Sequence, residues 1–185
     1  MWPLGHAAIA YLLYSLFTRT RLTDAPTALP AFIVLFGSQF PDLVDKPLAW
    51  YFGVLPTGRT LAHSLLVLIP LSLLLYAIAR RYGRPEYGIA FAIGALSHAL
   101  VDAVPALWGE TDPAFLLWPL VSVEPYEEGA PTVLSLLQQS IGEPYFLVEF
   151  VLALVALSVW NRDGRPGLGS LRSLLDRVRS PSDAM

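Results

Sequence analysis

The stretch Leu61–Ala79, LAHSLLVLIPLSLLLYAIA, is the clearest apolar run in the sequence. Its only strongly polar side chain is His63, which lies near its start. A helix of about 20 apolar residues is long enough to cross the hydrocarbon core of a bilayer. The run therefore predicts a membrane-spanning helix.

Four further apolar segments lie on either side of this run. Tyr145–Trp160 has aromatic residues at both ends, as helices that end at membrane interfaces do, and Tyr87–Leu107 is apolar except for one histidine and one aspartate. Pro3–Phe17 and Leu29–Phe40 are shorter, and tilted or half-inserted helices would accommodate them. We therefore predict an all-α fold, a polytopic helical membrane protein with about five transmembrane or membrane-embedded helices.

The composition agrees with a membrane protein and excludes several other classes. Of the 185 residues, 55% are hydrophobic and only 15% are charged, whereas soluble domains carry about 25% charged residues. The net charge is −3, and Lys46 is the only lysine among twelve basic residues, which argues against a nucleic-acid-binding surface. There is no cysteine, so any bound metal must be held by histidine and carboxylate side chains.

Arginines follow the first, third and fifth segments, and the positive-inside rule places these positions in the cytoplasm. We predict a multi-pass protein of the plasma or inner membrane, with the N-terminus and residues 41–60 and 108–144 outside. Residues 1–160 would form the membrane domain, and residues 161–185 an arginine-rich amphipathic tail in the cytoplasm. These arginines are Arg19, Arg21, Arg80, Arg81, Arg84 and the five between Arg162 and Arg179.

This topology brings all three histidines and three aspartates toward the outer face. Ionisable residues within or beside membrane helices are costly and are usually functional. A set of nitrogen and oxygen donors suits a divalent metal ion, zinc first, with manganese, iron or magnesium as alternatives. The predicted ligands are His6, Asp42, Asp45, His63, His98 and Asp102.

The spacing within this set supports shared sites. His98 and Asp102 are four residues apart, so on a helix they occupy one face. Asp42 and Asp45 follow Pro41, which we expect to start or end a helix, and they also share a face if their segment is helical.

Arg59 lies four residues before His63, where a guanidinium would hold a phosphate oxygen or stabilise a developing oxyanion. Glu149 lies within the fifth segment, and we consider it either a proton acceptor or a partner in an interhelical hydrogen bond.

Each member of the set also has a simpler explanation. His6 would be only a residue at a helix start, and Asp42 only a helix N-cap. His98 and Asp102 would form a structural hydrogen bond between helices, and Arg59 would extend to the membrane interface. The gathering of all of these residues at one depth favours a metal site over four separate explanations.

Four motifs occur in order along the chain: an early histidine (His6), Pro41-Asp42-x-x-Asp45, Arg59-x-x-x-His63-Ser64, and His98-x-x-x-Asp102. This set resembles the family of membrane-bound metal-dependent hydrolases, which includes LexA-regulated inner-membrane hydrolases of bacteria and is present in many archaea. The resemblance covers residues 1 to about 125. The family is distantly similar to zinc-dependent phospholipase C and the P1-type nucleases, helical enzymes that hold zinc with His and Asp and cleave phosphoesters.

The resemblance implies a metal-dependent membrane hydrolase with Arg59 and Asp45 among its catalytic residues. Because the site lies at the membrane interface, we expect a phosphoester in an amphiphilic or lipid substrate, cleaved by metal-activated water at the outer face. The alternative is a non-catalytic membrane protein, either a divalent-cation transporter or a structural bundle with a buried His/Asp network. A transporter needs polar residues through the whole membrane depth, and the inner halves of these segments offer essentially none.

Overall fold

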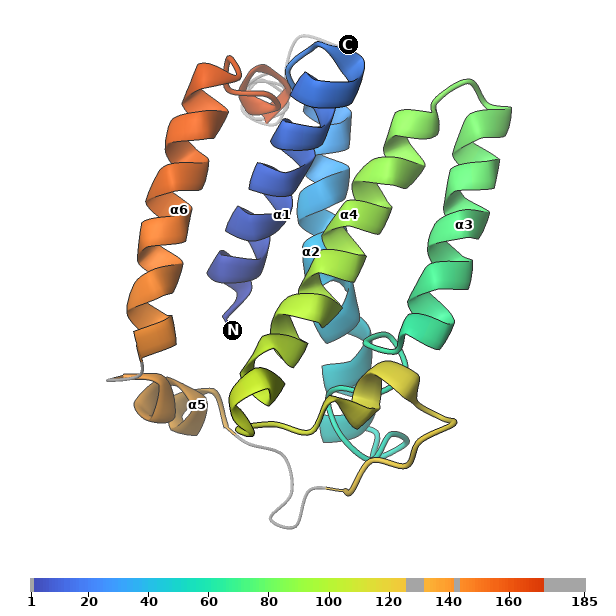
Figure 1. Cartoon of the computed structure of the whole chain (residues 1–185), viewed down its shortest axis with the longest axis vertical. Helices are drawn as coiled ribbons and strands as arrows, with labels where there is room; N and C mark the ends of the chain where they lie inside the picture. The colour runs from blue at the N-terminus through green and yellow to red at the C-terminus, as the bar shows by residue number, and fades with distance from the viewer. Residues whose placement is uncertain (1, 126–131, 142–143, 172–185) are drawn as a thin grey trace, which may run out of the picture.

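The computed structural model describes residues 2–125, 132–141 and 144–171, and within these ranges every regular element is helical, which confirms the predicted all-α class. Five long helices lie side by side in a bundle (Figure 1). They are α1 (Pro3–Phe17), α2 (Ala28–Trp50), α3 (Leu65–Arg81), α4 (Pro85–Ala103) and α6 (Pro144–Arg162). The short elements are α5 (Val133–Ser140), a π-helical turn at Thr18–Leu22, and 3-10 turns at Val104–Trp108 and Pro113–Leu117.

Helix α4 is the central helix of the bundle. It packs against α2, α3 and α1, whereas α6 packs mainly on α1. Small residues let α2 and α4 approach closely, because a Cβ atom added to Gly94 would lie only 2.4 Å from the carbonyl oxygen of Val34. A larger residue would force the two backbones apart.

The predicted end of the second segment at Phe40 is wrong. Helix α2 continues through Pro41 and Pro47 to Trp50. An internal proline removes one backbone hydrogen bond and strains the preceding turn, but the close packing of α2 on α4 outweighs that loss. Asp42 and Asp45 therefore lie on a helix rather than in an outer loop.

The third segment begins later than we predicted, whereas the first has the predicted bounds. The hydroxyl of Ser64 accepts a hydrogen bond from the backbone N–H of Leu66 and caps the start of α3. Since the cap fixes the helix start at Leu65, His63 lies in the preceding loop and not inside the helix. The amphipathic helix that we predicted for the C-terminal tail lies mostly outside the described residues.

Within the described part of the chain, one helical stretch, Pro85–Trp108, is by length and composition able to cross a membrane. It combines α4 with the 3-10 turn that follows it. The outward faces of the other long helices are also rich in exposed aliphatic side chains, among them Leu73 and Leu74 of α3 and Leu154 of α6. Contiguous exposed apolar surface of this kind marks a contact with protein or lipid.

Candidate metal centre

The six predicted ligand residues come together at the end of the bundle where α1 begins and α4 ends (Figure 1). The first turn of α1, the C-terminal parts of α2 and α4, and the loop before α3 each contribute to this cluster. Five of the six residues are buried and Asp42 is nearly so. They are His6 on α1, Asp42 and Asp45 on α2, His63 in the loop, and His98 and Asp102 on α4.

Three donor atoms form a compact triangle within this cluster. The Nε2 atoms of His63 and His98 are 3.1 Å apart. The Oδ1 atom of Asp42 lies 3.6 Å from the first of these nitrogens and 3.7 Å from the second. Zinc binds nitrogen and oxygen at about 2.0–2.2 Å, so ligands of one ion lie about 3–4 Å from one another. The triangle has the dimensions of a metal site.

Hydrogen bonds to the other ring nitrogens orient both imidazoles. The Nδ1 atom of His98 lies 2.6 Å from the carbonyl oxygen of Ser38, and because a carbonyl only accepts, this nitrogen carries the proton. The Nδ1 atom of His63 lies 2.8 Å from Oδ2 of Asp45 and donates to it in the same way. Both Nε2 lone pairs then face each other, which is repulsive unless a cation or a proton lies between them.

The two oxygens of Asp42 have different surroundings. Oδ2 accepts a hydrogen bond of 2.6 Å from the ammonium group of Lys46, one turn along α2. Oδ1 is buried and has no hydrogen-bond partner among the described residues. Buried carboxylate oxygens are almost always satisfied, so this atom has the surroundings of a metal ligand.

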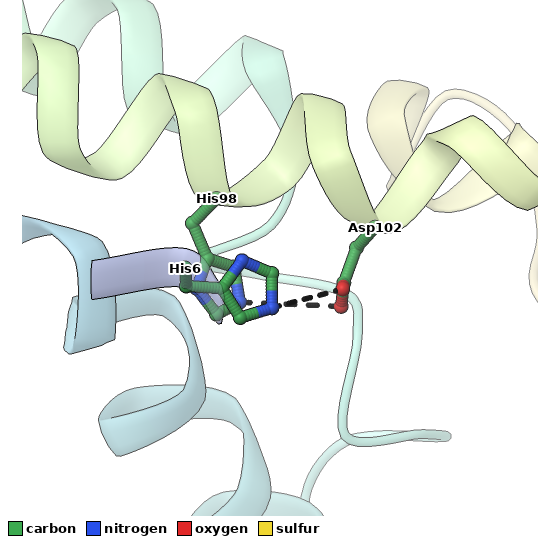
Figure 2. Close-up of side chains that lie close together, drawn as sticks. All are labelled: His6, His98 and Asp102. Carbon is green, nitrogen blue, oxygen red and sulfur yellow. Dashed lines mark ion pairs between the residues drawn. The ribbon is translucent and has the colours of Figure 1, made fainter. Parts of the chain in front are cut away.

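A second group of donors overlaps the first (Figure 2). Figure 2 shows His6 beside His98, with Asp102 one turn further along α4. The two imidazole rings are stacked with centroids 3.7 Å apart, and Nε2 of His6 lies 3.1 Å from Oδ1 of Asp102. The other carboxylate oxygen, Oδ2, is 3.8 Å from Nε2 of His63 and 2.8 Å from Nε of Arg59. Asp102 thus connects His6, His63 and Arg59.

Asp45 lies in the cluster, but its oxygens are already occupied. Besides the ring of His63, Asp45 accepts hydrogen bonds from the backbone N–H groups of Thr60 and Ala62, both at 2.8 Å, and of His63 at 3.2 Å. Its side chain is fully buried. Asp45 therefore fixes the loop and the ring of His63, and it is not part of either donor group.

The electrostatic field of the cluster favours positive charge. Burial opposes the protonation of His63, but the neighbouring carboxylates of Asp42, Asp45 and Asp102 outweigh burial and raise its pKa. Among the described residues, Lys46 pairs with Asp42 and Arg59 pairs with Asp102, whereas the cluster holds three carboxylates. The same field that favours a proton favours a metal cation.

Residues that sequence reasoning missed cover this end of the bundle. The ring of Phe115, in the 3-10 turn Pro113–Leu117, packs edge-on against His63 with centroids 6.1 Å apart. The hydroxyl of Ser64 donates to the carbonyl of Trp118 at 2.6 Å and holds the same segment in place. The Ser64 position in the third motif was the only sequence signal for this contact.

Glu149 forms an interhelical contact instead of facing the donor groups. It is buried on α6 and accepts a hydrogen bond of 2.6 Å from the backbone N–H of Trp2, just before α1. This carboxylate therefore holds the start of the helix that carries His6.

Another buried carboxylate, that of Asp163, follows the C-terminal end of α6. The sequence around Asp163 did not indicate that it is buried. Asp163 accepts hydrogen bonds of 2.7 Å from Tyr11 and Ser15 and forms an ion pair with Arg19. Burial opposes its ionisation, but hydrogen bonds from Ser15, Tyr11 and Arg19 outweigh burial and lower the pKa of Asp163. Asp163 and Glu149 thus join α6 to α1 at both ends.

No curated protein and no solved structure matches the chain. The family model described as YdjM inner membrane protein matches residues 1–165, which include all five long helices and every residue of the cluster. The chain therefore belongs to the YdjM inner membrane protein family.

Proposed function

We propose that the cluster binds a divalent metal ion and that the protein is a metal-dependent hydrolase of the membrane. One observation carries the proposal: two imidazole lone pairs and an unpartnered carboxylate oxygen converge within 3.7 Å. Without a cation or a proton among them, this arrangement leaves acceptors facing acceptors in a buried site, which is costly. A divalent ion satisfies all three atoms at once.

Within this proposal, each residue of the cluster has a distinct role. His63, His98 and Asp42 are the inner ligands, and Asp102 supplies a fourth donor, an oxygen, at the edge of the same group. His6 binds through the overlapping group that it forms with His98 and Asp102. Two imidazoles and two carboxylates suit zinc best, with manganese or iron as the next candidates. In this scheme Asp45 is a positioning residue that orients His63.

A divalent ion held there would supply the Lewis acidity that makes water nucleophilic at neutral pH. Arg59 lies against Asp102 at the edge of the cluster, and its side chain is 39% exposed. It is therefore accessible to a substrate oxygen, which it would neutralise as negative charge develops. An ester, first of all a phosphoester, is the substrate class that this combination of metal and guanidinium suits.

The apolar outer faces of the bundle support a multi-pass arrangement, with the cluster at one membrane surface. The exposed arginines Arg80, Arg81, Arg84 and Arg162 lie at the opposite end from the cluster. By the positive-inside rule that end is cytoplasmic, so the cluster and the N-terminus are outside. The substrate would then be an amphiphile, such as a lipid headgroup ester, that reaches the site from the outer surface.

Metal content is the first test. We expect about one to two divalent ions per chain in protein purified in detergent, measured by elemental analysis, and loss of most of that metal in His63→Ala and His98→Ala. Glu110→Gln, which changes an exposed acid in the loop beyond α4, is the matched control and should retain the metal. Wild-type metal content in both histidine variants would refute the site.

Turnover is the second test, and it separates an enzyme from a metal-stabilised bundle. We expect metal-dependent hydrolysis within a panel of phosphomonoesters, phosphodiesters and phospholipids. Arg59→Gln should keep the metal and lower kcat by about 10²–10³-fold, as loss of an oxyanion-stabilising group does. If a chelator lowers the unfolding temperature but no ester is hydrolysed with metal bound, the site is structural and the hydrolase proposal fails.

A further inference from the structure

An apolar groove of about 580 Å³ runs along α4 between α1 and α3. On α4 its lining includes Leu96 and Leu100, which lie on either side of His98 in sequence. At 100° per residue both side chains are about 160–200° around the helix from His98. The groove is therefore on the opposite face of α4 from His98.

The walls of the groove are aliphatic and aromatic. Helix α1 contributes Leu13 and Phe17, and α3 contributes Ile69 and Leu73. Leu13 and Leu73 are 45% and 63% exposed, so the groove opens outward from the bundle. In an inner membrane protein such a surface faces lipid.

The length of the groove indicates which membrane component fits. Its lining on α4 extends from Gly88 to Leu100, which at 1.5 Å per residue is about 18 Å. The hydrocarbon core of a bilayer is about 30 Å thick, so one leaflet accounts for about 15 Å. The groove thus matches the depth of one leaflet, which is the reach of a single acyl chain and is too short for a membrane-spanning partner helix.

One end of the groove is positively charged. Arg80 lies one turn beyond Tyr76, which lines the groove on α3, and Arg84 lies one turn before Gly88, which lines it on α4. Both arginines are exposed. The neighbouring acid Glu86 is 3.9 Å from Arg84 and offsets only part of this charge. Guanidinium groups at the end of an apolar groove match a phosphate attached to an acyl chain.

We propose that this groove binds one anionic phospholipid, with an acyl chain along α4 and the phosphate held by Arg80 and Arg84. The lipid is a bound partner and not the substrate of the metal centre, because the two sites lie on opposite faces of α4. The inference stands whether or not the cluster is catalytic.

Native mass spectrometry of the full chain in neutral detergent tests the proposal. The probes are phosphatidylglycerol and phosphatidylcholine with identical acyl chains, offered in equal amounts. We expect the wild type to retain phosphatidylglycerol several-fold over phosphatidylcholine, because near a membrane surface each arginine contributes about 1 kcal/mol of attraction to anionic lipid. The double variant Arg80→Gln, Arg84→Gln should lose this preference, and each single variant should reduce it.

Two controls make the result specific. Arg162→Gln removes an exposed arginine at the same end of the bundle but on α6, and it should keep the preference. Ala92→Phe places a ring in the groove and should reduce the retention of both lipids.

Three results would overturn the proposal. The first is equal retention of the two lipids by the wild type, and the second is an unchanged preference in a folded double variant, checked by circular dichroism and gel filtration. The third is a wild-type dimer in detergent that Ala92→Phe converts to a monomer, since a second copy of the chain would then occupy the groove. The wild-type comparison alone decides the matter if the variants do not fold.

Discussion

The position of one proton on each of two imidazole rings determines what the cluster can bind. The carbonyl of Ser38 accepts a hydrogen bond from the Nδ1–H group of His98, and the carboxylate of Asp45 accepts one from the Nδ1–H group of His63. Groups of this kind orient metal-bound histidines in many proteins and raise the basicity of the nitrogen that binds the metal. A structural hydrogen bond between the two histidines would instead need a proton on one of the facing nitrogens.

Asp45→Asn is the residue-scale test of this arrangement. Asparagine keeps the shape of the side chain but not its charge, so we expect metal affinity to fall about 10–100-fold, as it does when a group behind a metal ligand is changed. A competition titration against a chelator measures the affinity. Asp112→Asn is the matched control, because Asp112 is an exposed acid that caps the neighbouring 3-10 turn. Unchanged affinity in Asp45→Asn would contradict the positioning role.

At the scale of elements, the close approach of α2 to α4 brings the residues of the cluster together. Gly94 lets the backbone of α4 lie against that of α2, and one turn later His98 reaches the carbonyl of Ser38. This geometry depends on atoms 60 residues apart in sequence. It explains why the i, i+4 spacing of His98 and Asp102 was readable from the sequence, whereas the partner of His98 was not.

The contact between α6 and α1 at Asp163 predicts a pH dependence of stability. The pKa of Asp163 is lower in the folded protein than the usual unfolded value of about 3.9. Its stabilisation is therefore fully present above that value and is lost as pH falls toward the folded pKa. We expect the unfolding temperature of the wild type to drop below about pH 4 through loss of this contribution.

Asp163→Asn isolates this contribution from other acid effects. The variant should be less stable than the wild type at pH 7, by about 1–3 kcal/mol for lost charged hydrogen bonds. The difference should shrink as pH falls below about 4, because the unfolded wild-type carboxyl then binds a proton that the folded carboxylate does not. Thermal unfolding in detergent over this pH range is the measurement. A difference that does not change with pH would show that the charge of Asp163 does not stabilise the contact.

The accuracy of the sequence-based predictions varied among the elements. Continuous apolar runs gave the bounds of α1 and the approximate positions of α3, α4 and α6, since hydropathy is a local property. The path of α2 through Pro41 was missed because tertiary packing outweighed a local helix-breaking signal. The hydrogen bonds from Asp45 to the loop at Thr60 and Ala62 were missed because no short-range pattern encodes them.

At the scale of the whole molecule, the metal centre and the exposed arginines between α3 and α4 lie at opposite ends of the bundle. The His/Asp cluster lies where α1 begins and α4 ends, and the exposed Arg80 and Arg84 lie where α3 ends and α4 begins. The separation follows from the order of the motifs along antiparallel helices, because residues that end one helix and start the next share an end. This polarity is the basis for the proposed orientation in the membrane.

The absence of cysteine from the sequence makes the orientation directly testable. We expect Asp112→Cys, near the cluster, to react with a membrane-impermeant maleimide in intact cells. Arg84→Cys, at the opposite end, should react only after the membrane is permeabilised, because the positive-inside rule places it in the cytoplasm. The cysteine-free wild type is the background control. Reversed labelling of the two variants would invert the proposed topology, and labelling of both from outside would rule out a spanning bundle.

The polar contacts that Glu149 and Asp163 make with α1 bear on whether α6 can assemble with the other helices as a separate polypeptide. Helix α6 packs mainly on α1, and Glu149 and Asp163 hold it there by accepting hydrogen bonds from the backbone of Trp2 and the side chain of Tyr11. In the sequence, residues 126–131 connect the part of the chain that carries all six cluster residues to α5 and α6. We therefore expect α6 to behave as a detachable subunit: two polypeptides, separated at that connection and produced in the same cell, should find each other in the membrane and rebuild the complete bundle.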